Sequence, residues 1–256
     1  SSQCFHGTEE ELKETKNTQP CLFAMELAAA TVLIEKGIAP DVVAGFSLGE
    51  VVAATVSGAF DSETGFRLVC KRGELMQSEA ERFDTSMAAV VKLTPERVQE
   101  VCNKYSEVYP VNFNCPGQIT VSGISSQMTD FFADVKAAGG RAIPLKVKGA
   151  FHSPFMKAAA ESFAEELEKA ETKERSITLY SNMTAEVYTD DVVGLLSKQI
   201  CSPVQWEKII RNMIADGVDA FIEIGPGKTL TNMIKKIDAE VKAVSVNDYL
   251  AEVDVC

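Results

Sequence analysis

The pentapeptide G-F-S-L-G at residues 45–49 constrains the fold more than any other segment of the sequence. It follows the apolar residues 42–44 and precedes a helix-like stretch at residues 50–56. A G-x-S-x-G sequence between a strand and a helix is typical of a sharp turn that exposes the serine, because glycine accepts backbone conformations that side chains forbid. We therefore expect an α/β chain in which this turn presents Ser47 as a nucleophile.

The first amide of the helix that follows is the second chemical feature of this turn. The N-terminus of a helix carries free N–H groups and a partial positive charge, both of which favour a nearby anion. The N–H of Leu48 is therefore expected to stabilise an oxyanion formed on an acyl group bound at Ser47. The alternative is a chance match in a glycine-serine loop, and the apolar segments on both sides of residues 45–49 argue against it.

The chain contains only two histidines, His6 and His152, as candidates for the base that a serine nucleophile requires. His6 lies in a polar segment just before an acidic run, which is typical of a solvated surface residue. His152 follows a strand-like segment, residues 142–147. A single histidine is more often structural than catalytic, but the absence of any other base makes His152 the expected partner of Ser47.

The composition restricts the class of partner. A net charge of −12 repels nucleic acid and anionic membranes, so neither is expected as a main partner. No apolar run approaches the ~20 residues that a membrane span needs. The 7 cysteines are scattered and contain no C-x-x-C pair, which predicts reduced thiols in a cytoplasmic protein with no metal site. No cofactor is expected.

The order of predicted elements divides the chain into a core and an insert. Residues 85–148 read as β-α-β-β-α-β, the pattern of a ferredoxin-like unit. Residues 1–84 and 149–256 have the longer alternation of an α/β core. The segment G-P-G-K at residues 225–228 lacks the spacing of a phosphate loop, so we expect a tight strand-helix turn there.

Arg72 is a candidate for binding an anionic acyl group. It lies in a predicted helix over residues 61–81 with apolar neighbours, so it is expected to point partly inward. The planar guanidinium matches a carboxylate in two hydrogen bonds, which would select an acyl group with a free acid. A structural salt bridge with one of the many acidic residues is the alternative, and the pattern alone favours neither.

Six segments in the same order give the chain a specific resemblance to a known family. The position of His152 in mid-chain fits poorly with an α/β-hydrolase, in which the histidine comes late. The chain instead resembles the malonyl-CoA:acyl carrier protein transacylases of bacterial type II fatty acid synthesis. The resemblance rests on G-F-S-L-G-E at 45–50, R-G-E-L-M-Q at 72–77, N-F-N-C-P-G-Q at 112–118, G-A-F-H-S at 149–153, S-P-V-Q-W at 202–206 and E-I-G-P-G at 223–227.

This resemblance implies a fold and a set of residue roles. The fold is an α/β-hydrolase-like core with a parallel sheet, interrupted by a ferredoxin-like subdomain. Ser47 corresponds to the family's nucleophile, His152 to its base, and Arg72 to the arginine that pairs with the malonyl carboxylate. Gln199 matches the position whose backbone carbonyl orients the histidine, so its side chain is expected to matter little.

The resemblance also implies substrate contacts and partners. Phe151 matches the malonyl-selective form of the family, because its bulk would crowd an added α-methyl group. Asn114, in the segment at 112–118, is expected among the substrate-binding residues. Malonyl-CoA and acyl carrier protein are the expected partners.

Two departures from the family pattern leave alternatives open. Phe46 stands where histidine is commoner, and no glutamine loop that would give the second oxyanion donor precedes Ser47. We therefore expect that the sequence lacks its natural N-terminus. A polyketide-associated acyltransferase, a serine thioesterase and an inactive interaction domain are the other interpretations.

Overall fold

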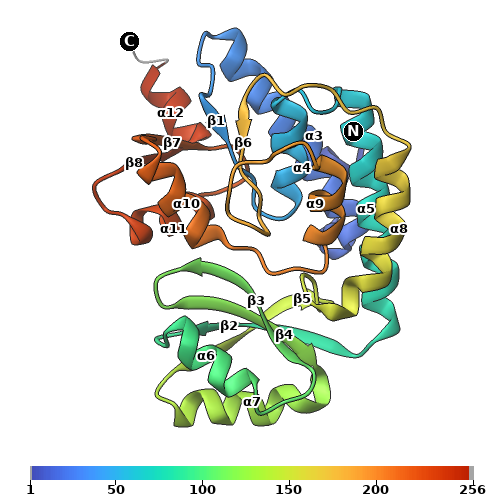
Figure 1. The fold of residues 1–256 in the computed structure, drawn as a ribbon, viewed down its shortest axis with the longest axis vertical. Helices are drawn as coiled ribbons and strands as arrows, with labels where there is room; N and C mark the ends of the chain where they lie inside the picture. Colours follow the sequence, from blue (N-terminus) through green and yellow to red (C-terminus); the bar gives the residue numbers. More distant parts are fainter. Residues whose placement is uncertain (1, 254–256) are drawn as a thin grey trace.

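The computed structural model describes residues 2–253, in which helices alternate with short strands (Figure 1). The helices are α1 (Ser2–His6), α2 (Glu9–Lys13), α3 (Thr15–Glu35), α4 (Leu48–Val56), α5 (Ser62–Arg82), α6 (Pro95–Cys102), α7 (Ser125–Ala137), the short 3-10 helix η1 (Pro154–Met156), α8 (Lys157–Glu168), α9 (Val192–Gln199), α10 (Trp206–Ala215), α11 (Thr229–Ile237) and α12 (Val246–Val253). The strands are β1 (Val42–Val43), β2 (Thr85–Val91), β3 (Val108–Cys115), β4 (Gln118–Ile124), β5 (Arg141–Lys148), β6 (Thr178–Leu179), β7 (Ala220–Glu223) and β8 (Lys242–Ser245).

The segment from β2 to β5 forms the lower part of the molecule in Figure 1. Its four strands make an antiparallel sheet in the order β3-β4-β2-β5. Helices α6 and α7 cover one face of this sheet, away from the rest of the chain, and bury their own apolar cluster. The hydroxyl of Thr94 accepts the N–H of Arg97 and Pro95 follows it, which fixes the start of α6.

The rest of the chain contains two short parallel sheets surrounded by helices. β1 pairs with β6, and β7 pairs with β8. A cavity of about 560 Å³ lies between the two sheets, lined mainly by apolar residues of α3, β1, α4, α10, β7 and α11. Its wall includes Gly45 and Gly49, so it reaches the turn that carries Ser47.

The two parts of the molecule are joined at the edge of β3. The loop before α10 adds to this edge, where the Phe113 N–H donates to Val204 O at 2.9 Å. In return, the Val204 N–H donates to Val111 O, also at 2.9 Å. These bonds fix the four-stranded sheet against the start of α10, next to the segment that contains Gln199.

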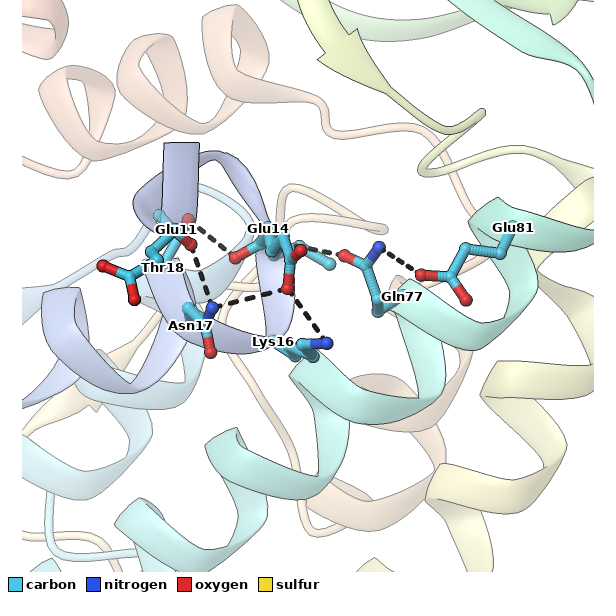
Figure 2. A network of polar contacts seen from close by, with 8 residues as sticks. Glu11, Glu14, Lys16, Asn17, Thr18, Gln77 and Glu81 are labelled. Carbon is cyan, nitrogen blue, oxygen red and sulfur yellow. Dashed lines mark hydrogen bonds and ion pairs between the residues drawn. The ribbon is translucent and has the colours of Figure 1, made fainter. Parts of the chain in front are cut away.

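Helices α3 and α5 pack closely side by side, and this contact places Gln19 of α3 next to Arg72 of α5. A Cβ at Gly73 would lie only 3.0 Å from the Lys16 Cα, which is tighter than most real Cβ contacts, so glycine favours this close crossing. Figure 2 shows the polar network above it, in which the Thr15 N–H donates to Gln77 Oε1 at 3.0 Å. The Gln77 amide in turn donates to Glu81 Oε1 at 2.8 Å.

The element order predicted from the sequence agrees with the structure. The α/β class with parallel strands is confirmed, and each strand and helix predicted within residues 85–148 is present. The long helix α3 begins at Thr15, whose N–H donates to Gln77 Oε1. Within residues 2–253, no helix combines the length and apolar character needed to cross a membrane.

Candidate active site

Ser47 occupies a strained turn between β1 and α4. Its backbone has φ 53° and ψ −104°, a conformation that residues with a side chain rarely adopt. A Cβ at Gly45 would collide with the backbone of Gly49, so the first glycine of the pentapeptide is required for the chain to reverse here. The strain lifts the serine side chain out of the turn toward His152.

The Ser47 hydroxyl meets the His152 imidazole at hydrogen-bond distance. Ser47 Oγ lies 2.7 Å from His152 Nε2, and His152 Nδ1 lies 2.9 Å from the backbone oxygen of Gln199. A carbonyl oxygen only accepts, so Nδ1 carries the proton and Nε2 keeps its lone pair for the serine proton. This is the tautomer that a general base requires.

The environment of His152 holds the imidazole neutral. Burial lowers its pKa to about 4, the charge of Arg72 acts in the same direction, and the hydrogen bond to the Gln199 carbonyl opposes both. At neutral pH the ring is therefore uncharged and able to accept a proton. His6, in contrast, is exposed in α1, as the sequence predicted.

Arg72 brings a buried positive charge to the nucleophile. Its guanidinium donates to Ser47 Oγ at 3.2 Å, to Gln19 Oε1 at 2.6 Å and to Gln199 Oε1 at 2.9 Å. The side chain is 1% exposed, and burial lowers its pKa to about 10 against the opposing charge of Glu50. These partners are neutral groups, and no ion pair between Arg72 and an acidic residue is found within residues 2–253, although the buried carboxylate of Glu50 acts on its charge.

The absence of an ion pair within residues 2–253 bears on the two interpretations of Arg72 given above. A buried cation without a paired anion is costly, so such sites tend to exist where an anion binds. The Nε atom of Arg72 also has no hydrogen-bond partner within residues 2–253. A structural salt bridge of Arg72 is therefore not found within residues 2–253, and its role in binding an anionic acyl group stays a prediction.

The side chain of Gln199 corrects the expectation that only its backbone matters. Its Oε1 accepts from Arg72, and its Nε2 donates to the backbone oxygen of Ser47 at 2.6 Å. The same residue therefore orients the histidine through its carbonyl and links the arginine to the serine turn through its amide. The sequence could not predict this, because Gln199 and Ser47 are 152 positions apart.

The N–H of Leu48 remains available beside the serine. The neighbouring amides of Ser47, Gly49 and Glu50 donate to Asn182 Oδ1, Phe46 O and Ser47 O. Among residues 2–253, no acceptor is found for the Leu48 N–H, which is the first amide of α4. Its place at the helix N-terminus suits it to a negatively charged oxygen.

Phe151 and Asn114 are not in hydrogen-bond contact with this group of polar residues. Phe151 precedes His152 and packs, half-buried, against the core cluster that includes α4 and α5. Asn114 is buried on β3, donates to Thr120 Oγ1 at 3.2 Å, and has an unpaired Oδ1. Their roles in binding substrate stay predictions.

The sequence analysis missed two residues that support the site, Gln19 and Asn182. Gln19 is buried on α3 and accepts from Arg72, and it also donates to Thr15 Oγ1 at 2.8 Å. Asn182 follows the carboxyl end of β6, where residues of parallel strands commonly form sites. That position was a usable signal for Asn182, whereas no pattern distinguished Gln19.

Comparison with known proteins identifies the family. The family model described as "Acyl transferase domain" matches residues 3–252. The chain belongs to the acyl transferase domain family. Among curated relatives of this acyl transferase domain, the malonyl CoA-acyl carrier protein transacylase of Bacillus subtilis (strain 168) is 39% identical over 256 residues, covering 97% of this chain and 80% of the relative.

Solved structures resemble this acyl transferase domain over almost its whole length. A malonyl CoA-acyl carrier protein transacylase from Clostridium perfringens is 36% identical with a TM-score of 0.94, covering 99% of this chain and 84% of that one. A malonyl-transacylase in complex with a type II polyketide synthase acyl-carrier protein is 34% identical with a TM-score of 0.94, covering 98% and 84%. The predicted resemblance is confirmed.

The two histidines of the acyl transferase domain predict opposite results on substitution. His152→Ala should lower the rate of acyl transfer by about 10³-fold or more, because Ser47 loses its base. His6→Ala should leave the rate unchanged, since His6 is exposed and remote in sequence from the site. Steady-state transfer assays on both variants test this, and a larger loss in His6→Ala than in His152→Ala would contradict it.

Proposed function

We propose that this chain transfers the malonyl group of malonyl-CoA to the phosphopantetheine thiol of acyl carrier protein. The observation that carries the proposal is the buried, unpaired Arg72 guanidinium, 3.2 Å from the Ser47 hydroxyl that contacts His152. A serine with a neutral base supports acyl transfer, and the cation beside it favours an acyl group with a free carboxylate. Relatives with malonyl transacylase names agree with this specificity.

The first half-reaction forms an ester on Ser47. His152 Nε2 removes the hydroxyl proton while Oγ attacks the thioester carbonyl of malonyl-CoA. The negative charge that develops on the carbonyl oxygen is stabilised by the Leu48 N–H. Collapse of this intermediate breaks the carbon–sulfur bond, and His152 gives its proton to the departing CoA thiolate.

The second half-reaction moves the malonyl group to the carrier. The phosphopantetheine thiol loses its proton to His152 and attacks the ester carbonyl. The Leu48 N–H again stabilises the oxyanion. Collapse releases Ser47, which takes the proton back from His152, so the enzyme returns to its starting state. Arg72 holds the malonyl carboxylate through both steps.

Three further residues complete the proposed site. The backbone carbonyl of Gln199 keeps Nδ1 of His152 protonated, which replaces the acid of a conventional triad. Phe151 limits the space beside the acyl group and thereby disfavours an α-methyl branch. Asn114 has an unpaired buried Oδ1, which supports its proposed contact with the substrate.

We also propose the finer description of the fold and the location. The order β3-β4-β2-β5 with two helices on one face supports a ferredoxin-like insert over 85–148. An α/β-hydrolase-like core would then comprise 1–84 and 149–256. The cysteines within residues 2–253 are free thiols, which supports a location in the cytoplasm.

Fatty acid synthesis is the proposed pathway, and polyketide synthesis is the second candidate. One observation favours the second candidate, namely the similar transacylase solved with a type II polyketide synthase carrier. The two carriers share the phosphopantetheine thiol, so the chemistry at Ser47 is the same for both. Transfer rates to purified carriers of each type distinguish the two pathways.

Intact-mass analysis of the protein after incubation with malonyl-CoA tests the proposal. One malonyl adduct should form and should disappear when holo acyl carrier protein is added, with the mass gained by the carrier. Loss of the adduct to water at the same rate without the carrier would instead indicate a serine thioesterase. No adduct at all would indicate an inactive interaction domain.

The acidic limb of the pH profile is expected to lie well below the usual range for histidine. The pKa of His152 is lowered to about 4 by burial, so the neutral, basic form persists until the pH falls through that value. The kcat/KM for malonyl-CoA should therefore stay level from about pH 8 down to about pH 5.5. An activity that falls by half near pH 6.5 would contradict this environment, provided that enzyme returned to neutral pH recovers full activity.

A further inference from the structure

The side-chain amide of Asn182 forms hydrogen bonds to the serine turn through both its oxygen and its nitrogen. Its Oδ1 accepts the backbone N–H of Ser47 at 2.8 Å, and its Nδ2 donates to the backbone oxygen of Gly45 at 2.6 Å. The side chain comes from the loop after β6, 135 positions away from Ser47, and the residue is 1% exposed. One amide side chain therefore bridges the two peptide groups between which the chain reverses.

The bridged turn is the strained part of the site. Ser47 has a positive φ, and such a conformation persists only when surrounding contacts impose it. Within residues 2–253, the Ser47 N–H and the Gly45 carbonyl have Asn182 as their only hydrogen-bond partner. Without this side chain, the turn is free to relax, which would move Oγ away from His152.

Asn182 is itself anchored to the helix that Ser47 begins. Glu50 on α4 accepts the backbone N–H of Asn182 at 2.8 Å and the hydroxyl of Tyr188 at 2.8 Å, both through Oε1. Glu50 is completely buried. The contacts from Ser47 to Asn182, from Asn182 to Glu50, and along α4 back to Ser47 form a closed ring, so the serine turn and the loop after β6 move together.

We propose that Asn182 is the positioning residue that holds Ser47 Oγ against His152 and leaves the Leu48 N–H free for the oxyanion, with Glu50 and Tyr188 as its anchor. Because Asn182 takes the Ser47 N–H, that amide is not available as an oxyanion donor. Within residues 2–253, Asn182 has no hydrogen bond to Arg72 and reaches it only through Gln199, whose Nε2 donates to Asn182 Oδ1 at 3.4 Å, so its main effect is expected on the reactivity of the serine. This assignment rests on the proposed function and adds a residue to it.

The variant Asn182→Ala tests the assignment in the full chain. The kcat for malonyl transfer should fall by about 10²-fold, the loss expected when a reacting group is displaced by about 1 Å. The KM for malonyl-CoA should change by less than about threefold, since the contacts that bind substrate are kept. Asn103→Ala is the matched control, because Asn103 also accepts a hydrogen bond through Oδ1, from Gln99 Nε2 at 2.8 Å, and lies at the end of α6, outside the site.

Labelling of Ser47 by phenylmethanesulfonyl fluoride gives a second measurement that needs no malonyl group. The labelling rate should fall in Asn182→Ala and stay unchanged in Asn103→Ala. Equal labelling and equal kcat in the Asn182 variant and the parent would overturn the assignment. If the parent protein is labelled but takes no malonyl group, the proposed function fails while the positioning role is still tested.

A second variant covers a failure of Asn182→Ala to fold. Asn182→Asp keeps the size and the acceptor for Ser47 but loses the donor to Gly45, so labelling should again fall, and equal labelling would overturn the assignment.

Discussion

Ser47→Ala is expected to remove the malonyl adduct completely and to lower kcat by about 10⁴-fold or more. The hydroxyl oxygen is the atom that bonds to the acyl group, and no other hydroxyl is found within hydrogen-bond distance of His152 Nε2 in residues 2–253. Loss of the oxygen therefore blocks both half-reactions. Alanine fits the same turn, so the loss should not come from unfolding.

Intact mass after incubation with malonyl-CoA is the measurement, with thermal unfolding as a check on folding. Ser57→Ala is the matched control, because Ser57 ends the same helix, is buried and binds only the Ala54 carbonyl through its hydroxyl. The control should form the adduct at the parental rate. A malonyl adduct that persists in Ser47→Ala would show that another side chain carries the acyl group.

The serine turn could be predicted from the sequence because it is a local feature. Apolar residues before it, a helix-forming stretch after it and the glycines within it are all close in sequence, and together they restrict the backbone at Ser47. The same holds for residues 85–148, whose helices and strands follow one another closely in the sequence. The order of these helices and strands was therefore predictable, whereas their first and last residues in the structure differ by a few positions from those predicted.

The support around the serine could not be predicted, because it depends on residues brought together by the fold. Gln19, Asn182 and Gln199 come from α3, the loop after β6 and α9, and each is a polar residue that would suit a surface equally well. Only the packed structure places the three amides around Arg72 and Ser47. The sequence predicted the reacting groups, and the structure adds the groups that contact them.

The neutral surroundings of Arg72 explain how one site can select a charged acyl group. The amides of Gln19 and Gln199 satisfy guanidinium N–H groups without cancelling the charge. A carboxylate in their place would neutralise the arginine and would repel the malonyl carboxylate. Burial lowers the pKa of His152 and the charge of Arg72 adds to this effect, so the cation that we propose binds the acyl carboxylate also helps to keep the base neutral.

Arg72→Ala is expected to change selectivity more than it changes the basic reaction. A buried charge pair that loses one partner costs about 2–5 kcal/mol, and this loss applies only where the acyl group carries an anion. The ratio of kcat/KM for malonyl-CoA to that for acetyl-CoA should therefore fall by about 30-fold or more. Acetyl transfer serves as the internal reference, because Arg72 also donates to Ser47 Oγ and its loss affects both substrates through that contact.

Arg175→Ala is the control for loss of an arginine side chain in general. Arg175 donates to the backbone oxygens of Tyr188 and Thr189 at 3.0 and 2.7 Å and has no contact with Ser47 or His152. The selectivity ratio of this control should equal that of the parent protein. If Arg72→Ala lowered both activities equally and left the ratio unchanged, the guanidinium would serve only to hold Gln19 and Gln199 in place, and the carboxylate of the acyl group would have to be recognised elsewhere.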